Sequence, residues 1–210
     1  MKQFITILFF SISIASFGQS AKDIPFEKDF FPNQKEELKL AKKELEIGNE
    51  EYEGKRPGRY KFALEHYLKA NTFNPNNSLL NFKIGVCYIN SNFKMKSKSH
   101  FEKAYELNPA IDPEIHYYLG RGYHLNMDWD KAIAEYQTFK AGLDPKKKDQ
   151  APLLADANKK IAECNYGKEL VKTPVRVFID NIGNKVNSPY PDYGPIISAD
   201  EDVMYFTSRR

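Results

Sequence analysis

The sequence predicts an all-α fold of about three helix–turn–helix repeats plus a capping helix, followed by a short extended β tail. Three observations lead to this prediction. Residues 78–109 read as a complete pair of helices that the stretches on both sides copy. Residues 150–171 then carry an apolar stripe at helical spacing. At Pro174 the pattern changes to alternating apolar and polar residues interrupted by Pro and Gly, which indicates strands and turns.

The copies share small, aromatic and Pro residues at a constant spacing. The residues 34 positions before Ser97, Phe101, Ala104 and Pro109 are Ala63, Tyr67, Ala70 and Pro75. The residues 35 positions after Gly85, Tyr88, Ser97 and Phe101 are Gly120, Tyr123, Ala132 and Tyr136. A small residue lets one helix approach another, an aromatic ring fills the space beside it, and Pro ends the helix. Because one such pair cannot bury its own apolar face, the pattern predicts an array.

This pattern resembles the tetratricopeptide repeat (TPR), which has a period of about 34 residues and a Leu-Gly, Tyr, Ala, aromatic and Pro signature. The resemblance implies a TPR-type α-solenoid in which the first helix of each repeat lines a concave wall. The family's offsets place the following protein-binding candidates on that wall: Phe82, Ile89, Asn90, Tyr117, Arg121 and His124, together with Val86 and Leu125. Val86 and Leu125 are the members that best suit packing between helices. Asn90, Arg121 and His124 are the better candidates for binding, because they are polar within apolar helices.

The N-terminal residues indicate that the protein is exported from the cytoplasm. Lys2 precedes the apolar run 4–10, and the small residues Ser16 and Gly18 follow, which is typical of a secretory signal peptide spanning residues 1–18. The apolar run is too short for a membrane-spanning helix. Residues 19–32 form a lead-in segment without helical periodicity, whose Phe26, Phe30 and Phe31 are expected to pack on the first helix.

The first repeat is predicted to be irregular. Its first helix runs from Asn33, as N-cap, to Glu53, and its second helix covers 59–73. The distance from Gly48 to Gly85 is 37 residues, which indicates about three extra residues in the turn between these helices.

The later helices also have start signals. The second repeat is predicted to begin at Asn77 or Ser78. The third is predicted to begin with Asp112 as N-cap and Pro113 at the first helical position, and its second helix is predicted to be capped by Asp128. With the capping helix, the array therefore spans residues 33–171, and residues 172–210 form a separate tail.

In the tail, the alternation of Val175, Val177 and Ile179 predicts a strand, and two further short strands are expected at 196–197 and 203–207, with no sheet to join inside this chain. The segments 187–195, 198–201 and 205–210 are similar to the opening blade of the WD-like β-propeller in OmpA-family envelope proteins of Bacteroidota. The resemblance implies the order signal peptide, TPR array, propeller and peptidoglycan-binding OmpA-like domain. Only the first strands of one blade are present, so we expect a longer protein.

The residues that carry chemistry do not form a catalytic motif. The four His residues lack zinc-ligand spacing, and the chain has no nucleophile elbow, phosphate-binding Gly-rich loop or Cys-x-x-Cys. Cys87 and Cys164 are expected to be separate buried thiols, because they lie several helices apart. Removal of residues 1–18 leaves 30 basic and 28 acidic side chains, so the charge does not indicate nucleic acid. We therefore expect no enzyme activity, cofactor or metal.

The leading hypothesis is a non-enzymatic periplasmic scaffold. Its TPR array would dock other envelope proteins of an outer-membrane-associated complex for secretion or outer-membrane protein assembly. Attachment to peptidoglycan would come from domains absent from this chain, which is not itself membrane-spanning. The alternative is a chaperone-like module that binds an extended peptide or client protein in the concave groove.

Overall fold

The computed structural model describes residues 22–209, so the predicted signal peptide lies outside the described residues. The chain divides into two compact units, of which the first ends at Val171 and the second begins at Lys172. The described residues are mostly helical with a short two-stranded sheet near the C-terminus, which confirms the predicted fold class at this level.

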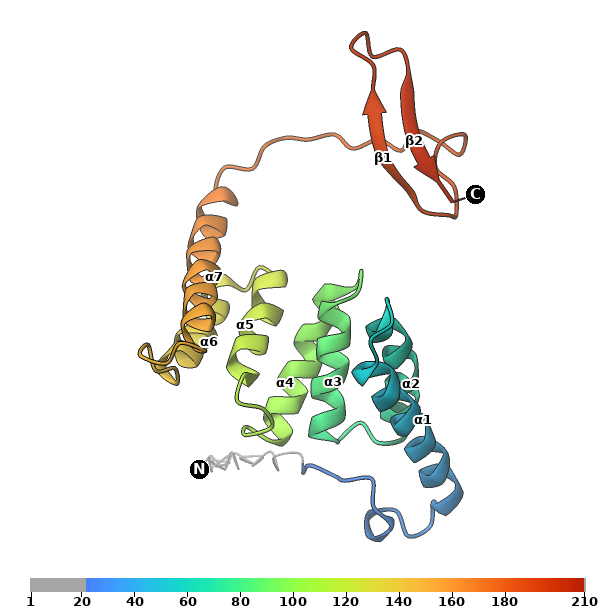
Figure 1. The fold of residues 1–210 in the computed structure, drawn as a ribbon, viewed down its shortest axis with the longest axis vertical. Coiled ribbons are helices and arrows are strands. Elements are labelled where there is room, and N and C mark those ends of the chain that lie inside the picture. Colours follow the sequence, from blue (N-terminus) through green and yellow to red (C-terminus); the bar gives the residue numbers. More distant parts are fainter. Residues whose placement is uncertain (1–21, 210) are drawn as a thin grey trace, which may run out of the picture. The chain divides into compact units, whose positions relative to one another are not determined.

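The first unit is built from helices that pack against their neighbours in the sequence (Figure 1). Its described residues form α1 (Lys35–Glu53), α2 (Arg59–Phe73), α3 (Ser78–Ile89), α4 (Ser97–Leu107), α5 (Ile115–Leu125), α6 (Trp129–Ala141) and α7 (Ala151–Leu170). Two short 3-10 helices, η1 (Lys28–Phe30) and η2 (Lys94–Lys96), precede α1 and α4. The extensive helix–helix contacts all join consecutive helices, from α1 with α2 to α6 with α7.

The same close contact occurs in three helix pairs. A Cβ atom added to Gly48 of α1 would lie 2.6 Å from the Tyr67 ring of α2. Equivalent atoms on Gly85 and Gly120 would lie 2.4 Å from the Phe101 ring and 2.7 Å from the Tyr136 ring. All three rings are fully buried. A side chain at these glycines would overlap the ring, so the spacing found in the sequence reflects a physical contact.

The apolar core continues from one helix pair to the next. One buried cluster joins residues of α1, α2 and α3, a second joins α3, α4 and α5, and a third joins α5, α6 and α7. Helix α3 contributes to two clusters because both of its faces are covered, and ten of its residues are buried. Each helix pair therefore depends on its neighbour for burial of its apolar surface.

The helix starts agree only in part with the predicted caps. Asn77 caps α3, because its side-chain oxygen accepts the amide of Leu80 at 2.9 Å. Asn33 is not the N-cap of α1, which begins at Lys35 after Gln34 and has no side-chain cap. Without a capping bond, the start of α1 depends on its tertiary contacts, and the buried Leu38 supplies one of these in the first turn.

The predicted start of the third repeat is wrong by two residues. Helix α5 begins at Ile115, and Asp112 instead accepts the amide of Glu114 at 2.8 Å in a preceding turn. Asp128 does stand directly before α6, but its carboxylate makes no capping hydrogen bond. It accepts the Lys98 ammonium of α4 at 2.6 Å, and this charged interaction is stronger than a bond to a neutral amide.

The lead-in packs on α2 as well as on α1. The rings of Phe26 and Phe31 lie 6.3 Å and 4.7 Å from the Phe73 ring of α2, whereas Phe30 is exposed. The Asp23 carboxylate accepts both the amide and the hydroxyl of Ser78, at 2.8 Å and 2.5 Å. The expectation that the three aromatic residues pack on the first helix is therefore correct only in part. Phe26 and Phe31 also contact α2, and Asp23 binds the first residue of α3.

The second unit contains an antiparallel pair, β1 (Asp192–Ile197) and β2 (Met204–Ser208). Ile197 pairs with Met204, and the register shifts between Tyr193 and Ile196, across Gly194, which has a positive φ of 66°, and Pro195, which cannot donate to a ladder. The two strands therefore pair with each other, contrary to the expectation that they have no sheet to join.

Residues 174–183 contain neither helix nor strand, so the predicted strand at 175–179 is wrong. Val175 and Ile179 are 85% and 90% exposed. A strand needs a neighbour to satisfy its backbone groups, and the alternating residues find no neighbour within the described chain.

Candidate functional site

The six candidate residues from the sequence separate into buried and accessible groups. Phe82 and Ile89 are 7% and 3% exposed and belong to the second core cluster. The Phe82 ring makes an edge contact with Tyr118, with 5.2 Å between ring centroids. These two candidates therefore contribute to packing and leave little surface for a ligand. Asn90 is exposed at the end of α3, where its amide donates to the Val86 carbonyl at 2.8 Å.

The other three candidates lie on α5, and the structure brings two of them together in one pocket. This pocket has a volume of about 240 Å³ and is lined by Arg121, His124, Leu125, Tyr136, Lys160 and Glu163. Tyr117 is on the same helix, and its hydroxyl donates to Asp156 of α7 at 2.7 Å. Helices α5, α6 and α7 thus all contribute to the pocket, which is smaller than a typical cofactor site.

The sequence did not identify Tyr136, Lys160 and Glu163 as pocket residues. Tyr136 occupies the repeat's aromatic core position, and Lys160 and Glu163 lie on the polar face of α7. Periodicity shows which face of α7 is polar, but it does not show that this face meets α5. Lys160 and Glu163 are three residues apart on α7, a spacing that favours an ion pair within this helix and does not indicate contact with α5.

The charges in this pocket are unevenly paired. Lys160 donates to Glu163 at 3.0 Å, and this hydrogen bond lowers the pKa of the Glu163 carboxyl. Arg121 forms no ion pair among residues 22–209 and has its guanidinium 6.0 Å from the centre of the Tyr117 ring. Burial lowers the pKa of His124, whose ring makes an edge contact with Trp129 at 5.5 Å. At neutral pH the unpaired positive charge in the pocket is therefore that of Arg121.

The remaining histidines bridge the two helices of a pair. The Nδ1 atom of His66 lies 2.6 Å from Glu44, and that of His116 lies 2.7 Å from Glu135. In the pair between them, His100 contacts the Asn81 side-chain oxygen at 3.0 Å. These contacts occur at equivalent positions of the three pairs, four residues before the close-contact glycine and one residue before the aromatic ring. They are structural contacts rather than metal sites.

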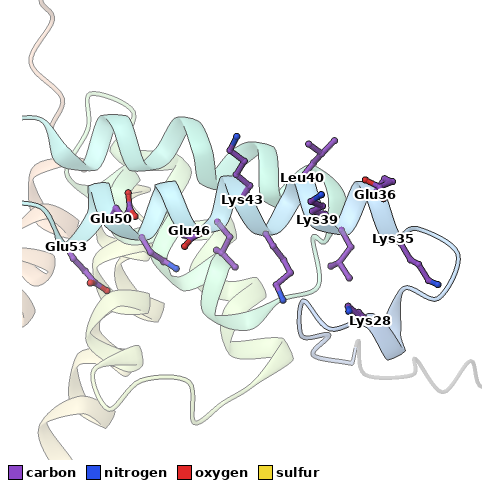
Figure 2. A pocket seen from close by; sticks show the side chains of 13 residues that line it. Lys28, Lys35, Glu36, Lys39, Leu40, Lys43, Glu46, Glu50 and Glu53 are labelled. Carbon is purple, nitrogen blue, oxygen red and sulfur yellow. The ribbon is translucent and has the colours of Figure 1, made fainter.

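A second, larger hollow follows α1 and η1 and has a volume of about 1250 Å³ (Figure 2). Its lining is rich in charged side chains, which are Lys28, Lys35, Glu36, Lys39, Lys42 and Lys43 toward the start of α1 and Glu46, Glu50 and Glu53 toward its end. The exposed Leu40 is one of three apolar side chains in the lining. None of the six sequence candidates lines this hollow.

The described residues hold no group of three or more His, Cys, Asp and Glu side chains that could bind a metal ion. Cys87 and Cys164 are buried and unpaired, which confirms the expectation of separate thiols, and burial raises their pKa values to about 12 and about 11. Within 22–209 no helix has both the length and the apolar character needed to cross a membrane.

No protein-family model matches the chain, and no curated protein matches it significantly.

Proposed function

We propose that residues 35–170 form a TPR-type α-solenoid that acts as a non-enzymatic docking scaffold for other proteins. The observation that carries the proposal is the threefold recurrence of one helix-pair design. In each pair a glycine of the first helix meets a buried ring of the second, and a polar contact crosses between the helices one turn away. Stacked helix pairs of this kind present an extended surface, which is the usual binding feature of repeat proteins.

The proposed location is the periplasm, in association with the outer membrane. Support comes from the signal-like residues 1–18 and from the resemblance of the tail to the start of a WD-like propeller. The strand pair β1–β2 is compatible with the first part of a blade, since a hairpin by itself is only marginally stable in water. The proposed partners are envelope proteins of a secretion or outer-membrane assembly complex, and peptidoglycan would be reached through domains outside this chain.

The alternative is a chaperone-like module that captures an extended peptide or client. The pocket between α5, α6 and α7 favours it, because an accessible cavity lined by both charged and aromatic groups suits a peptide side chain. The two functions differ in their ligand: the scaffold binds folded envelope proteins, whereas the module binds an unfolded segment.

Site-specific photo-crosslinking in the envelope of the native host tests the scaffold. A photoreactive residue at Asn90, which is exposed at the end of α3, should crosslink a defined envelope protein in folded form. The matched control is Lys61, an exposed residue of α2. Crosslinks of equal yield at both sites, or products that contain no envelope protein, would contradict the scaffold. Crosslinks only to newly synthesised, unfolded chains would favour the chaperone-like module.

A further inference from the structure

One side of α1 carries six exposed charges in a regular order. Three lysines are followed by three glutamates, and at 3.6 residues per turn all six fall within about 80° of the helix circumference: Lys35, Lys39, Lys42, Glu46, Glu50 and Glu53. We call this set the α1 charge stripe. Its side chains line the hollow of about 1250 Å³ along α1 (Figure 2). Glu36 and Lys43 lie beside the stripe and carry opposite charges.

Most neighbouring charges within the stripe repel one another. Residues three or four positions apart lie side by side on a helix. Of the five such pairs in the stripe, four carry like charges, and only Lys42 and Glu46 are opposite in sign. The last turn of α1 also contains glutamates and no basic residue, although the carbonyl end of a helix favours positive charge.

The described part of the chain does not supply the charges that would offset this repulsion. None of the six stripe residues forms an ion pair within residues 22–209. The hollow is lined by side chains of α1 and by Lys28 of η1, and no other helix of the first unit contributes to the described lining. The stripe is therefore accessible along its whole length to a partner of opposite charge order.

A reversed copy of α1 has that charge order. The lysines at 35, 39 and 42 and the glutamates at 53, 50 and 46 lie at matching distances, to within half a residue, from a point at residue 44. Two antiparallel copies of α1 that meet at this point bring together the pairs Lys35 and Glu53, Lys39 and Glu50, and Lys42 and Glu46. Each pair occurs twice, as in every isologous twofold interface. A parallel arrangement would bring like charges together, so the pattern selects one orientation.

Apolar side chains accompany the stripe. Leu45 lines the hollow one residue from the centre of this arrangement, so the two copies bring their Leu45 side chains together. Leu40, which is 65% exposed, adds apolar surface to the same lining. Lys28 lies near Lys35, at the end of α1 that would meet Glu53 of the second copy (Figure 2).

We propose that the α1 charge stripe is a homodimerisation surface on which a second copy of this chain packs its own α1 in antiparallel orientation. The proposal adds self-association to the docking function and does not depend on it. A helix of 19 residues is about 28 Å long, so one helix pair buries less area than a standard interface of about 800 Å² per partner. We therefore expect a weak dimer whose specificity comes from charge and which salt dissociates.

Sedimentation equilibrium of the purified chain measures the dimerisation constant. In about 50 mM salt the mean mass should rise from monomer toward dimer as the protein concentration increases. In about 500 mM salt dimerisation should be weaker by about tenfold, because salt screens exposed charges. A chain that stays monomeric in low salt, or a dimer of equal strength at both salt concentrations, would overturn the proposal.

Charge reversals identify the surface and the register. Lys39→Glu and Glu50→Lys should each weaken the dimer by about tenfold, because each puts two like-charged pairs into the interface. The double variant Lys39→Glu/Glu50→Lys makes both pairs opposite again and should dimerise within about twofold of the parent chain. Its matched control is Lys35→Glu/Glu50→Lys, which has the same net charge but leaves like charges facing each other, and should stay weak. Restoration by both double variants, or by neither, contradicts the antiparallel register.

Mixing the single variants gives an independent measurement. An equal mixture of Lys39→Glu and Glu50→Lys should form a heterodimer more strongly than either variant forms its own dimer, because both pairs are then opposite in sign. The substituted residues are exposed, and Lys and Glu have similar helix propensities, so all variants should keep the Tm of the parent chain in circular dichroism. A mixture that associates no better than its components would refute the proposal.

Discussion

Replacing Gly85 by alanine tests the contact that recurs in the three helix pairs. The added Cβ atom would lie 2.4, 2.6 and 2.8 Å from three ring atoms of Phe101, where ordinary van der Waals contact begins at 3.4 Å. The ring has little room to move. It is fully buried and lies 5.9 Å from the Phe82 ring and 5.4 Å from the Tyr118 ring. The substitution therefore forces a shift of about 1 Å in the middle of the second core cluster.

Two effects of opposite sign determine the size of the change in stability. Overpacking of a core costs about 1–3 kcal/mol, and an overlap with three atoms of a confined ring belongs near the upper end of this range. Alanine favours a helix over glycine by about 1 kcal/mol. We therefore expect Gly85→Ala to lower the free energy of unfolding by about 1–2 kcal/mol, which corresponds to about 2–4 °C of Tm per kcal/mol for a chain of this size.

Thermal unfolding followed by circular dichroism measures this change, and Gly142→Ala provides the control. Gly142 has right-handed helical dihedral angles, and a Cβ atom there would meet its nearest neighbour at 3.5 Å, so its Tm should stay the same or rise. The double variant Gly85→Ala, Phe101→Leu should lose less stability than the sum of the two single variants, because the shorter side chain relieves the overlap. A Tm for Gly85→Ala at or above that of the parent chain would refute the contact.

Four other predictions follow from the same structure. Ala132→Leu should cost about 1–3 kcal/mol of unfolding free energy, because Ala132 is fully buried between helices, and an unchanged Tm would contradict this packing. Tyr67→Phe should lower the free energy of unfolding by about 0.5–1.5 kcal/mol, because it removes the hydrogen bond to Asn49. Tyr136→Phe should leave that free energy unchanged or higher, because the Tyr136 hydroxyl has no partner among the described residues. Equal losses in chemical denaturation of the two variants would contradict this difference. Burial lowers the folded-state pKa of His100 below its ordinary 6.5. As the pH falls, the unfolded chain therefore takes up the His100 proton before the folded chain does, and the free energy of unfolding should decrease below this pH. His100→Gln should reduce this dependence of the unfolding free energy on pH, measured by denaturation curves between neutral and mildly acidic pH. Amides of residues 174–191 should exchange with deuterium far faster than those of α3–α6 in the isolated chain, and comparable protection would show a stabilising contact for this segment.

Much of the helical architecture could be predicted because helix formation and close helix contact leave local, periodic signals. The spacing of Gly85 and Phe101 follows from how far apart two residues of a helical hairpin must be to face each other, and it repeats wherever the hairpin repeats. The start of α3 at Asn77 and the long helix α7 could likewise be read from residues near in sequence. In the tail, alternation identified the two paired strands but overpredicted a third at 175–179, because a strand exists only where a neighbour completes its hydrogen bonds.

Polar partnerships, in contrast, depended on which residues of different helices come face to face. Asp128 has the ideal residue type for a cap, yet it accepts from Lys98, which lies 30 residues away in the chain. Asp23 has no periodic signal at all, yet it anchors the start of α3. Tyr67 and Tyr136 occupy the same repeat position, and only the tertiary structure shows that one hydroxyl has a partner and the other does not. Periodicity reports the face on which a side chain lies, whereas the satisfaction of its polar atoms depends on residues brought opposite it by the packing of neighbouring helices.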